Sequence, residues 1–238
     1  MTGRRRAVAA EFAGTALLLA AVVGSGTMGE ALAAGNAGVA LLANAAATAA
    51  VLYVLMILFA ADSGAHFNPA VTLVAWRSGE LDGRAAASYV VVQIAGAVAG
   101  VLLAHAMFDL ALVQPGARAR GGTGQWLGEA VATAGLVLAI RVGSRRAPAA
   151  VPVLVAAWIF AAYWFTSSTS FANPAVTIAR ALTTTFAGIR PFDVPAFVAA
   201  QLTGAAAGAA LARWWTRTPL PPPGGPPMMA SPPSGASR

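Results

Sequence analysis

Long apolar stretches with at most one charged residue recur along this chain, and they restrict its fold more than any other feature. Six of them have the length of a membrane span, at about residues 7–29, 38–60, 85–108, 124–140, 149–165 and 194–212. The hydrocarbon core of a bilayer is about 30 Å thick, so a helix needs about 20 mostly apolar residues to cross it. We therefore predict an all-α integral membrane protein with six transmembrane helices.

Composition agrees with this class and excludes several others. Hydrophobic residues make up 58% of the 238 residues and charged residues only 10%, whereas soluble domains carry about 25% charged residues. Without cysteine, disulfide scaffolds, thiolate metal sites and cysteine nucleophiles are excluded. The two histidines lack metal-ligand spacing, and no phosphate loop or nucleophile elbow is present. We expect no enzyme activity, no cofactor, no metal and no nucleic-acid partner.

The arginines indicate the orientation in the membrane, because cytoplasmic loops are enriched in basic residues. If the N-terminus is cytoplasmic, the inner side of the membrane has more arginines than the outer side. The inner set is Arg4, Arg5, Arg6, Arg77, Arg84, Arg141, Arg145, Arg146, Arg213, Arg217 and Arg238, and the outer set is Arg118, Arg120, Arg180 and Arg190. We predict a multi-pass protein of the cell membrane with both termini cytoplasmic. Residues 1–6 are then a short basic arm, and the Pro-rich residues 216–238 a disordered cytoplasmic tail.

An internal repeat divides the spans into halves at about 7–108 and 124–215. NPAVT occurs at 68–72 and at 173–177, and QIAGAVAG at 93–100 matches QLTGAAAG at 201–208. EFAGTALLLA from Glu11 pairs with EAVATAGLVL from Glu129, in the same order along the chain. Three spans in each half make the second half enter the membrane from the opposite side. This is the inverted 3+3 arrangement of channels and transporters, whose site lies between the halves.

Two short segments, 68–77 and 173–181, begin with Asn-Pro and lie between spans. Asparagine is a good helix N-cap and proline suits the first turn, so each segment is predicted to be a re-entrant half-helix. Non-helical backbone at membrane depth is tolerated only inside protein or along a water-filled path. Two opposed N-termini, each with about +0.5 charge, would repel protons and cations. Asn68 and Asn173 would offer amide donors to a neutral solute.

Glu11 and Glu129 are carboxylates inside predicted spans, at matching positions of the repeat. The interpretation we favour is structural, with each carboxylate accepting hydrogen bonds from backbone N–H groups of a re-entrant loop. The alternative is a proton relay in an ion-coupled secondary transporter, for which Asp62 is the remaining candidate. A junction-forming membrane protein without permeability is a third interpretation. The pairs Gly96/Gly100 and Gly204/Gly208 are expected to pack the two halves together.

These motifs resemble the aquaporin (major intrinsic protein) family over about residues 7–215. SGAHFNPAVT at 63–72, FANPAVT at 171–177 and AEFAGT at 10–15 carry the resemblance. It implies six helices, two half-helices and a homotetramer with one pore in each subunit, through which water or small neutral solutes pass. It also places two pore motifs, which comprise Asn68, Pro69, Ala70, Asn173, Pro174 and Ala175.

The chain departs from the family at Val176, where most members have an arginine that lines the outer constriction, donates to the permeating molecule and helps to repel cations. Ungapped spacing puts the other filter positions at Thr48, Ala161 and Ser170, with Phe160 in place of Ala161 after a one-residue gap. With Ala161 the filter would be wide and uncharged. The resemblance is then to atypical bacterial members, and the hypothesis is a channel for glycerol-like polyols or arsenite as well as water. A strict water channel is the alternative.

Two further residues stand near the expected mouths of the pore. Arg180 follows Val176 by four residues, one turn outward, and either replaces part of the missing charge or points to headgroups or a loop. We favour the second interpretation. His66 precedes the first Asn-Pro pair at the cytoplasmic vestibule, where it is either a satisfied loop histidine, as we favour, or a titrating gate.

Overall fold

The computed structural model describes residues 3–217, which are helical apart from short connections. Six long helices in this range are apolar enough to cross a membrane, which confirms the six predicted spans. They are α1 (Gly3–Leu32), α2 (Ala37–Ser63), α4 (Gly83–Met107), α5 (Thr123–Arg146), α6 (Val151–Phe165) and α8 (Val194–Trp215). The two predicted half-helices are α3 (Pro69–Arg77) and α7 (Pro174–Ala179). Short 3₁₀ turns at Pro148–Ala150 (η1), Arg180–Leu182 (η2) and Pro191–Asp193 (η3) precede α6, extend α7 and precede α8.

The first helix begins earlier than predicted. α1 already includes residues 3–6, whereas the prediction that they form a cytoplasmic arm stays a prediction. Arginine is a good helix former, so the membrane helix continues into the basic segment. The predicted tail falls almost entirely on residues 218–238, which lie outside the described residues.

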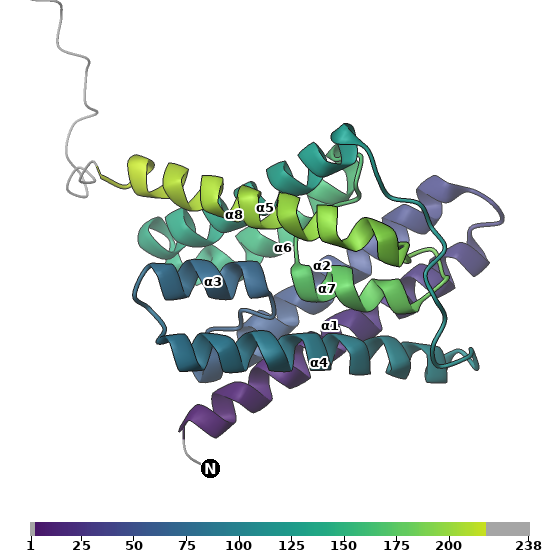
Figure 1. Cartoon of the computed structure of the whole chain (residues 1–238), viewed down its shortest axis with the longest axis horizontal. Helices are drawn as coiled ribbons and strands as arrows, with labels where there is room; N and C mark the ends of the chain where they lie inside the picture. Colours follow the sequence, from purple (N-terminus) through teal and green to yellow (C-terminus); the bar gives the residue numbers. More distant parts are fainter. Residues whose placement is uncertain (1–2, 218–238) are drawn as a thin grey trace, which may run out of the picture.

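The two half-helices point to opposite ends of the molecule (Figure 1). The N-terminus, the end of α8 and the end of α3 lie together at one end, which we call the terminal end. The α1–α2 loop, the α4–α5 loop and the end of α7 lie at the other end, which we call the loop end. Because α3 and α7 run outward in opposite directions from the middle, their N-termini face each other there. This is the inverted 3+3 arrangement that the repeat predicted.

Glycines allow close approach between helices of the same half. A Cβ on Gly100 of α4 would lie 2.1 Å from the carbonyl oxygen of Ala16 in α1, and one on Gly208 of α8 would lie 2.3 Å from that of Ala134 in α5. A Cβ on Gly96 would likewise lie 2.5 Å from the carbonyl oxygen of Phe12 in α1, and one on Gly204 would lie 2.2 Å from that of Ala130 in α5. The prediction that these pairs join the two halves was therefore wrong. They join α1 to α4 and α5 to α8, because repeat-related glycines make repeat-related contacts.

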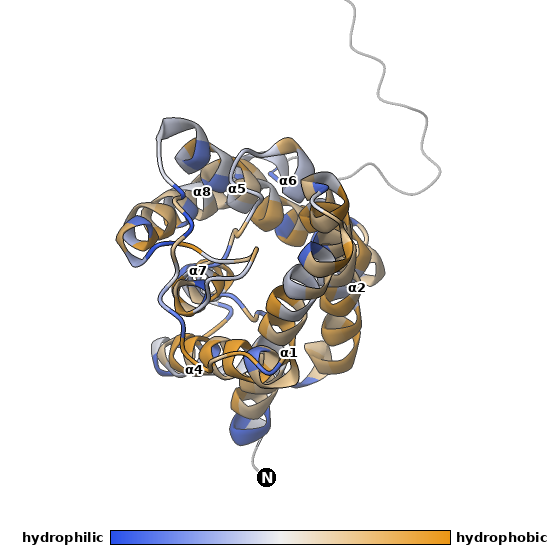
Figure 2. Ribbon diagram, turned by 90° about the vertical axis from the view of Figure 1, so that its right-hand side faces the viewer, coloured by the Kyte–Doolittle hydropathy of each residue, from blue (hydrophilic) through white to orange (hydrophobic). Residues whose placement is uncertain are grey.

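The outside of the bundle is apolar along most of its length. Viewed from the loop end, the long helices surround α7 and are mainly hydrophobic (Figure 2). Large side chains such as Leu58, Val91 and Leu127 are more than 60% exposed. In a membrane protein such side chains face lipid, whereas buried polar groups mark the interior path. The interior here does contain fully buried Glu, Gln, Asn and Thr side chains.

Candidate conduction pathway

Each half-helix begins with a capped turn that its Asn-Pro pair builds. The side-chain oxygen of Asn68 accepts a hydrogen bond from the N–H of Ala70 at 2.9 Å. The oxygen of Asn173 accepts one from Ala175 at 3.0 Å and another from Val176 at 3.4 Å. Both asparagines have extended backbone, and the following proline takes the first helical position, where no N–H is needed. The caps satisfy part of the exposed N–H groups at each N-terminus.

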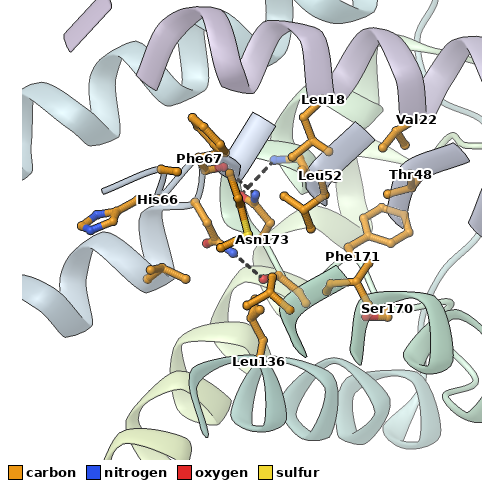
Figure 3. Close-up of a pocket in the computed structure, with 18 of the residues that line it drawn as sticks. Leu18, Val22, Thr48, Leu52, His66, Phe67, Leu136, Ser170, Phe171 and Asn173 are labelled. Carbon is orange, nitrogen blue, oxygen red and sulfur yellow. Dashed lines mark hydrogen bonds between the residues drawn. The ribbon is translucent and has the colours of Figure 1, made fainter. Parts of the chain in front are cut away.

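The amide nitrogens of the same asparagines connect the two halves. Asn68 Nδ2 donates to the carbonyl oxygen of Ala172 at 2.8 Å, and Asn173 Nδ2 donates to that of Phe67 at 2.8 Å. An amide nitrogen carries two hydrogens, so one N–H on each asparagine is left for the cavity that both residues line. Figure 3 shows Asn173 in the middle of this cavity, between His66 and the group of Thr48 and Ser170.

Both re-entrant loops have a left-handed backbone just before the asparagine. Ala65 and Phe67 have φ of 50° and 47°, and the matching residues Ser170 and Ala172 have φ of 48° and 48°. Non-glycine residues adopt this conformation at a cost of about 1–2 kcal/mol each. Such strain persists only where surrounding contacts determine the conformation.

Glu11 supplies these contacts for the first loop. Its Oε1 accepts hydrogen bonds from the hydroxyl of Ser63 at 2.7 Å and the N–H of His66 at 2.9 Å. Its Oε2 accepts from the N–H of Phe67 at 2.7 Å and from Gln93 Nε2 at 2.8 Å. The carboxylate is fully buried and has four donors around two oxygens, as the structural interpretation requires.

Glu129 makes the equivalent set in the second half. Its two oxygens accept from the N–H of Phe171 at 2.8 Å, the N–H of Ala172 at 2.9 Å and Gln201 Nε2 at 2.6 Å. Gln201 also donates to the hydroxyl of Thr177 at 2.7 Å, as Gln93 does to Thr72 at 2.9 Å in the first half. Sequence reasoning had matched the two glutamines without giving them a role. The signal was their place in the repeat, because each glutamine lies in the third long helix of its half and its glutamate lies in the first.

The cavity between the half-helices has a volume of about 60 Å³. Its walls come from both halves at matching positions, with Leu18 and Val22 of α1 opposed by Leu136 and Ile140 of α5. Polar side chains are few in its lining: His66, the two asparagines, Tyr163, Ser170 and Thr48. Figure 3 shows His66 on one side of Asn173, and Thr48 and Ser170 on the other. An apolar wall with a short series of hydrogen-bonding groups suits small uncharged solutes.

A wider vestibule of about 250 Å³ adjoins this cavity at the terminal end and shares His66, Met56 and Ile140 with it. Glu80 and Arg141 form an ion pair on its wall. His66 is half-buried, its ring lies 3.1 Å from the hydroxyl of Thr72, and its backbone is held by Glu11. It is thus a hydrogen-bonded residue of the vestibule.

Three of the four expected filter residues line the cavity near the loop end, and one does not. Thr48, Ser170 and Val176 are lining residues. Ala161 is exposed on the outside of α6, and Phe160 does not line the cavity either. The position taken from ungapped spacing was therefore wrong. Val155, Ile159 and Tyr163 form the inward stripe of α6, and Ala161 lies about 200° around the helix from Tyr163.

Tyr163 is a lining residue of the cavity that sequence reasoning missed. Its hydroxyl lies 3.4 Å from the Thr48 hydroxyl, so α6 and α2 meet at this level of the cavity. A bulky aromatic side chain therefore lines the cavity where sequence reasoning expected the small Ala161. The signal was the spacing of four residues that relates Tyr163 to Ile159 and Val155.

Arg180 is buried, although we favoured an arginine pointing to headgroups or to a loop. Only 2% of its surface is exposed, and its guanidinium lies 3.4 Å from the centre of the Phe171 ring. Nε donates to the carbonyl oxygen of Ala187, so the arginine contacts a loop, as one of the two expected alternatives has it. A second buried arginine, Arg120 of the α4–α5 loop, lies 4.7 Å from the same ring. Burial, with the nearby charge of Arg180, lowers the pKa of Arg120 to about 9, which leaves it charged at neutral pH.

The remaining polar candidates have structural partners. Asp62 forms an ion pair with Arg6 at 2.7 Å. His105 lies within 2.7 Å of the carbonyl oxygen of Leu112 and 2.8 Å of the Thr183 hydroxyl. Together with the hydrogen bonds of Glu11 and Glu129, these contacts leave the coupled-transporter alternative without a free carboxylate among its three candidates. Within residues 3–217 no cluster of three potential metal ligands occurs.

Known proteins are similar to this chain in sequence and in fold. The family model described as "Major intrinsic protein" matches residues 2–162 and 135–231. Aquaglyceroporin AqpS of Rhizobium meliloti is 56% identical over 210 residues, which cover 88% of this chain and 89% of that protein. Probable aquaporin AqpM of Archaeoglobus fulgidus is 43% identical over 83 residues, 35% of this chain and 30% of that protein.

A solved structure agrees at the level of fold. The aquaglyceroporin from Plasmodium falciparum superposes with a TM-score of 0.70 and 16% sequence identity, over 89% of this chain and 95% of that one. The two family matches, the long alignment and the paired Asn-Pro half-helices agree with one another. The chain belongs to the major intrinsic protein family and is a membrane channel, not an enzyme.

Proposed function

We propose that this channel conducts water and small neutral solutes passively, with glycerol-like polyols as its main cargo and uncharged metalloid acids such as arsenous acid as a second class. The observation that carries the proposal is the cavity lining at the level of Val176, where Thr48, Tyr163, Ser170 and Val176 present no charge. A solute with hydroxyl groups can form successive hydrogen bonds with Thr48, Ser170 and the two asparagines. Its carbon atoms meanwhile contact the apolar wall. The name of the 56% identical relative, an aquaglyceroporin, supports the same cargo.

Ions and protons are excluded, in this proposal, by the two half-helix N-termini. Each presents partial positive charge where the asparagines meet, and the donors there orient the passing molecule. This centre consists of the two Asn-Pro motifs, Asn68, Pro69, Ala70, Asn173, Pro174 and Ala175. Glu11 and Glu129 hold the loops that precede these motifs in place.

We further propose that the terminal end faces the cytoplasm of a cell-membrane protein, since the terminal end has most of the arginines. The functional unit is proposed to be a homotetramer with one pore in each subunit. Chemical cross-linking in native membranes tests the tetramer, and protease access to the α4–α5 loop from outside the cell tests the orientation.

Stopped-flow light scattering on proteoliposomes tests the cargo. Vesicles are challenged in parallel with an impermeant osmolyte, glycerol and arsenous acid. Rapid shrinkage followed by reswelling in the last two supports the proposal. Shrinkage with no reswelling would identify a strict water channel, in which Tyr163 closes the filter to solutes. Rates equal to those of empty liposomes would refute both.

A further inference from the structure

We propose that Arg180 supplies the positive charge and the hydrogen-bond donor at the loop end of the pore that Val176 does not supply. Arg180 thereby adds to the exclusion of cations by the half-helix N-termini and selects solutes with acceptor oxygens. The inference rests on the proposed conduction path and assigns a selectivity residue to it.

The first support is an unsatisfied donor. Nη1 of Arg180 is buried and has no hydrogen-bond partner among residues 3–217. Buried polar groups are nearly always hydrogen-bonded, and a charged donor without an acceptor is especially costly. In this proposal, water or a solute from the pore, reaching between the lining side chains, is the partner of this nitrogen.

The second support is position. Two neighbours of the guanidinium, the Phe171 ring and the Tyr163 side chain, are themselves lining residues of the cavity. Val176, the expected place of the arginine, lines the cavity one helical turn away. The charge is therefore displaced outward by one turn and held just behind the lining side chains.

The third support is the way the guanidinium is held. Nε donates to the Ala187 carbonyl, and the Phe171 ring lies under the guanidinium plane, which stabilises a cation at this place. Arg120, in the α4–α5 loop, adds a second positive charge beside the same ring. It donates to the carbonyl oxygens of Gly188 at 2.9 Å and Ser168 at 3.1 Å and contacts the same ring. Arg120 is thus a positioning residue of the loops around Arg180.

The chemical consequence concerns which solutes pass. A guanidinium has donors only, so it binds hydroxyl or oxyacid oxygens and repels ammonium-type cations of the same size. Methylammonium is a suitable probe, because it is small enough to follow water and differs from a neutral solute by its charge.

The experiment compares methylammonium entry into proteoliposomes with water permeability of the same vesicles. We expect Arg180→Gln to conduct water and to admit methylammonium about tenfold faster than wild type, because one charge next to a partly buried path adds on the order of 1 kcal/mol to the barrier for a cation. Arg180→Met is a second neutral variant whose apolar chain still packs on Phe171. Arg180→Lys keeps the charge and is expected to exclude methylammonium.

Arg118→Gln is the matched control, because Arg118 lies in the same loop region but is exposed and rests on Phe186. It is expected to behave as wild type. Adding Val176→Arg to Arg180→Gln is expected to restore exclusion. Neutral Arg180 variants that conduct water and still exclude methylammonium would overturn the inference, and so would an Arg180→Lys variant that leaks as much as Arg180→Gln. Absence of water flux in the wild type would instead refute the proposed function.

Discussion

Replacing Glu11 by glutamine tests the buried hydrogen bonds that hold the first re-entrant loop. The amide oxygen of glutamine can keep two of the four donors that Glu11 now accepts, for example the Ser63 hydroxyl and the His66 N–H. Gln93 can turn its own amide and offer the oxygen that now has no partner among residues 3–217. The backbone N–H of Phe67 cannot adapt, so it loses its acceptor at 2.7 Å.

The size of the effect follows from these groups. One stranded buried donor costs about 1–3 kcal/mol, and two bonds that change from a charged to a neutral acceptor weaken by about 1 kcal/mol each. We therefore expect Glu11→Gln to lower the free energy of unfolding by about 3–5 kcal/mol. The left-handed Ala65 and Phe67 would lose the contacts that keep them in place, so water permeability per folded molecule should fall as well.

The assay is unfolding in mixed micelles with increasing dodecyl sulfate, followed by tryptophan fluorescence. Glu30→Gln is the control, because Glu30 lies on the same helix and is exposed. If Glu11→Gln unfolds within about 0.5 kcal/mol of Glu30→Gln, the scale of ordinary surface substitutions, the argument is refuted. Wild-type stability combined with altered proton flux would revive the relay interpretation of this carboxylate.

Three further predictions concern the filter and the helix contacts. Val176→Arg should lower glycerol flux about tenfold, equivalent to about 1.4 kcal/mol of added barrier, and leave water flux less affected; unchanged glycerol flux in stopped-flow measurements would argue that Val176 does not face the path. Tyr163→Ala should raise glycerol flux over water flux, whereas Ala161→Ser, on the outside of α6, should change neither; the reverse pattern would restore Ala161 to the filter. Gly100→Ala should destabilise the fold by about 1–3 kcal/mol in thermal unfolding, because its Cβ would meet the Ala16 oxygen at 2.1 Å. Gly3→Ala, with nothing within 4 Å, should have no such effect, and equal behaviour of the two variants would contradict the close contact.

The fold was predictable because several independent patterns agree. Span length, the Asn-Pro pairs and the order of the repeated motifs all require two inverted halves. The placement of Glu11 and Glu129 in the matched segments also indicated a shared role. Each of these inferences depends on residues within one segment or on the repeat, so it needs no knowledge of how helices rotate against one another.

The residues that sequence reasoning misplaced depend on packing between segments. Ala161 was chosen by counting back from Val176, but the count fixes neither the rotation of α6 nor the length of the loop that follows it. Gly100 could have met any neighbouring helix, and only the tertiary arrangement selects α1. Arg180 is charged, so exposure was the natural expectation, and its burial depends on Phe171 and on the Ala187 carbonyl.

The exchanged hydrogen bonds of the two asparagines have a consequence for how the chain is made. Asn68 and its acceptor are 104 residues apart, and Asn173 and its acceptor are 106 residues apart. At a synthesis rate of about 5–20 residues per second, the first loop waits roughly 5–20 seconds for its partner. During this interval Phe67 has a carbonyl in the membrane interior with no donor from the second half. The first half is therefore an incomplete intermediate that the insertion machinery must shelter until the second Asn-Pro segment enters from the opposite side.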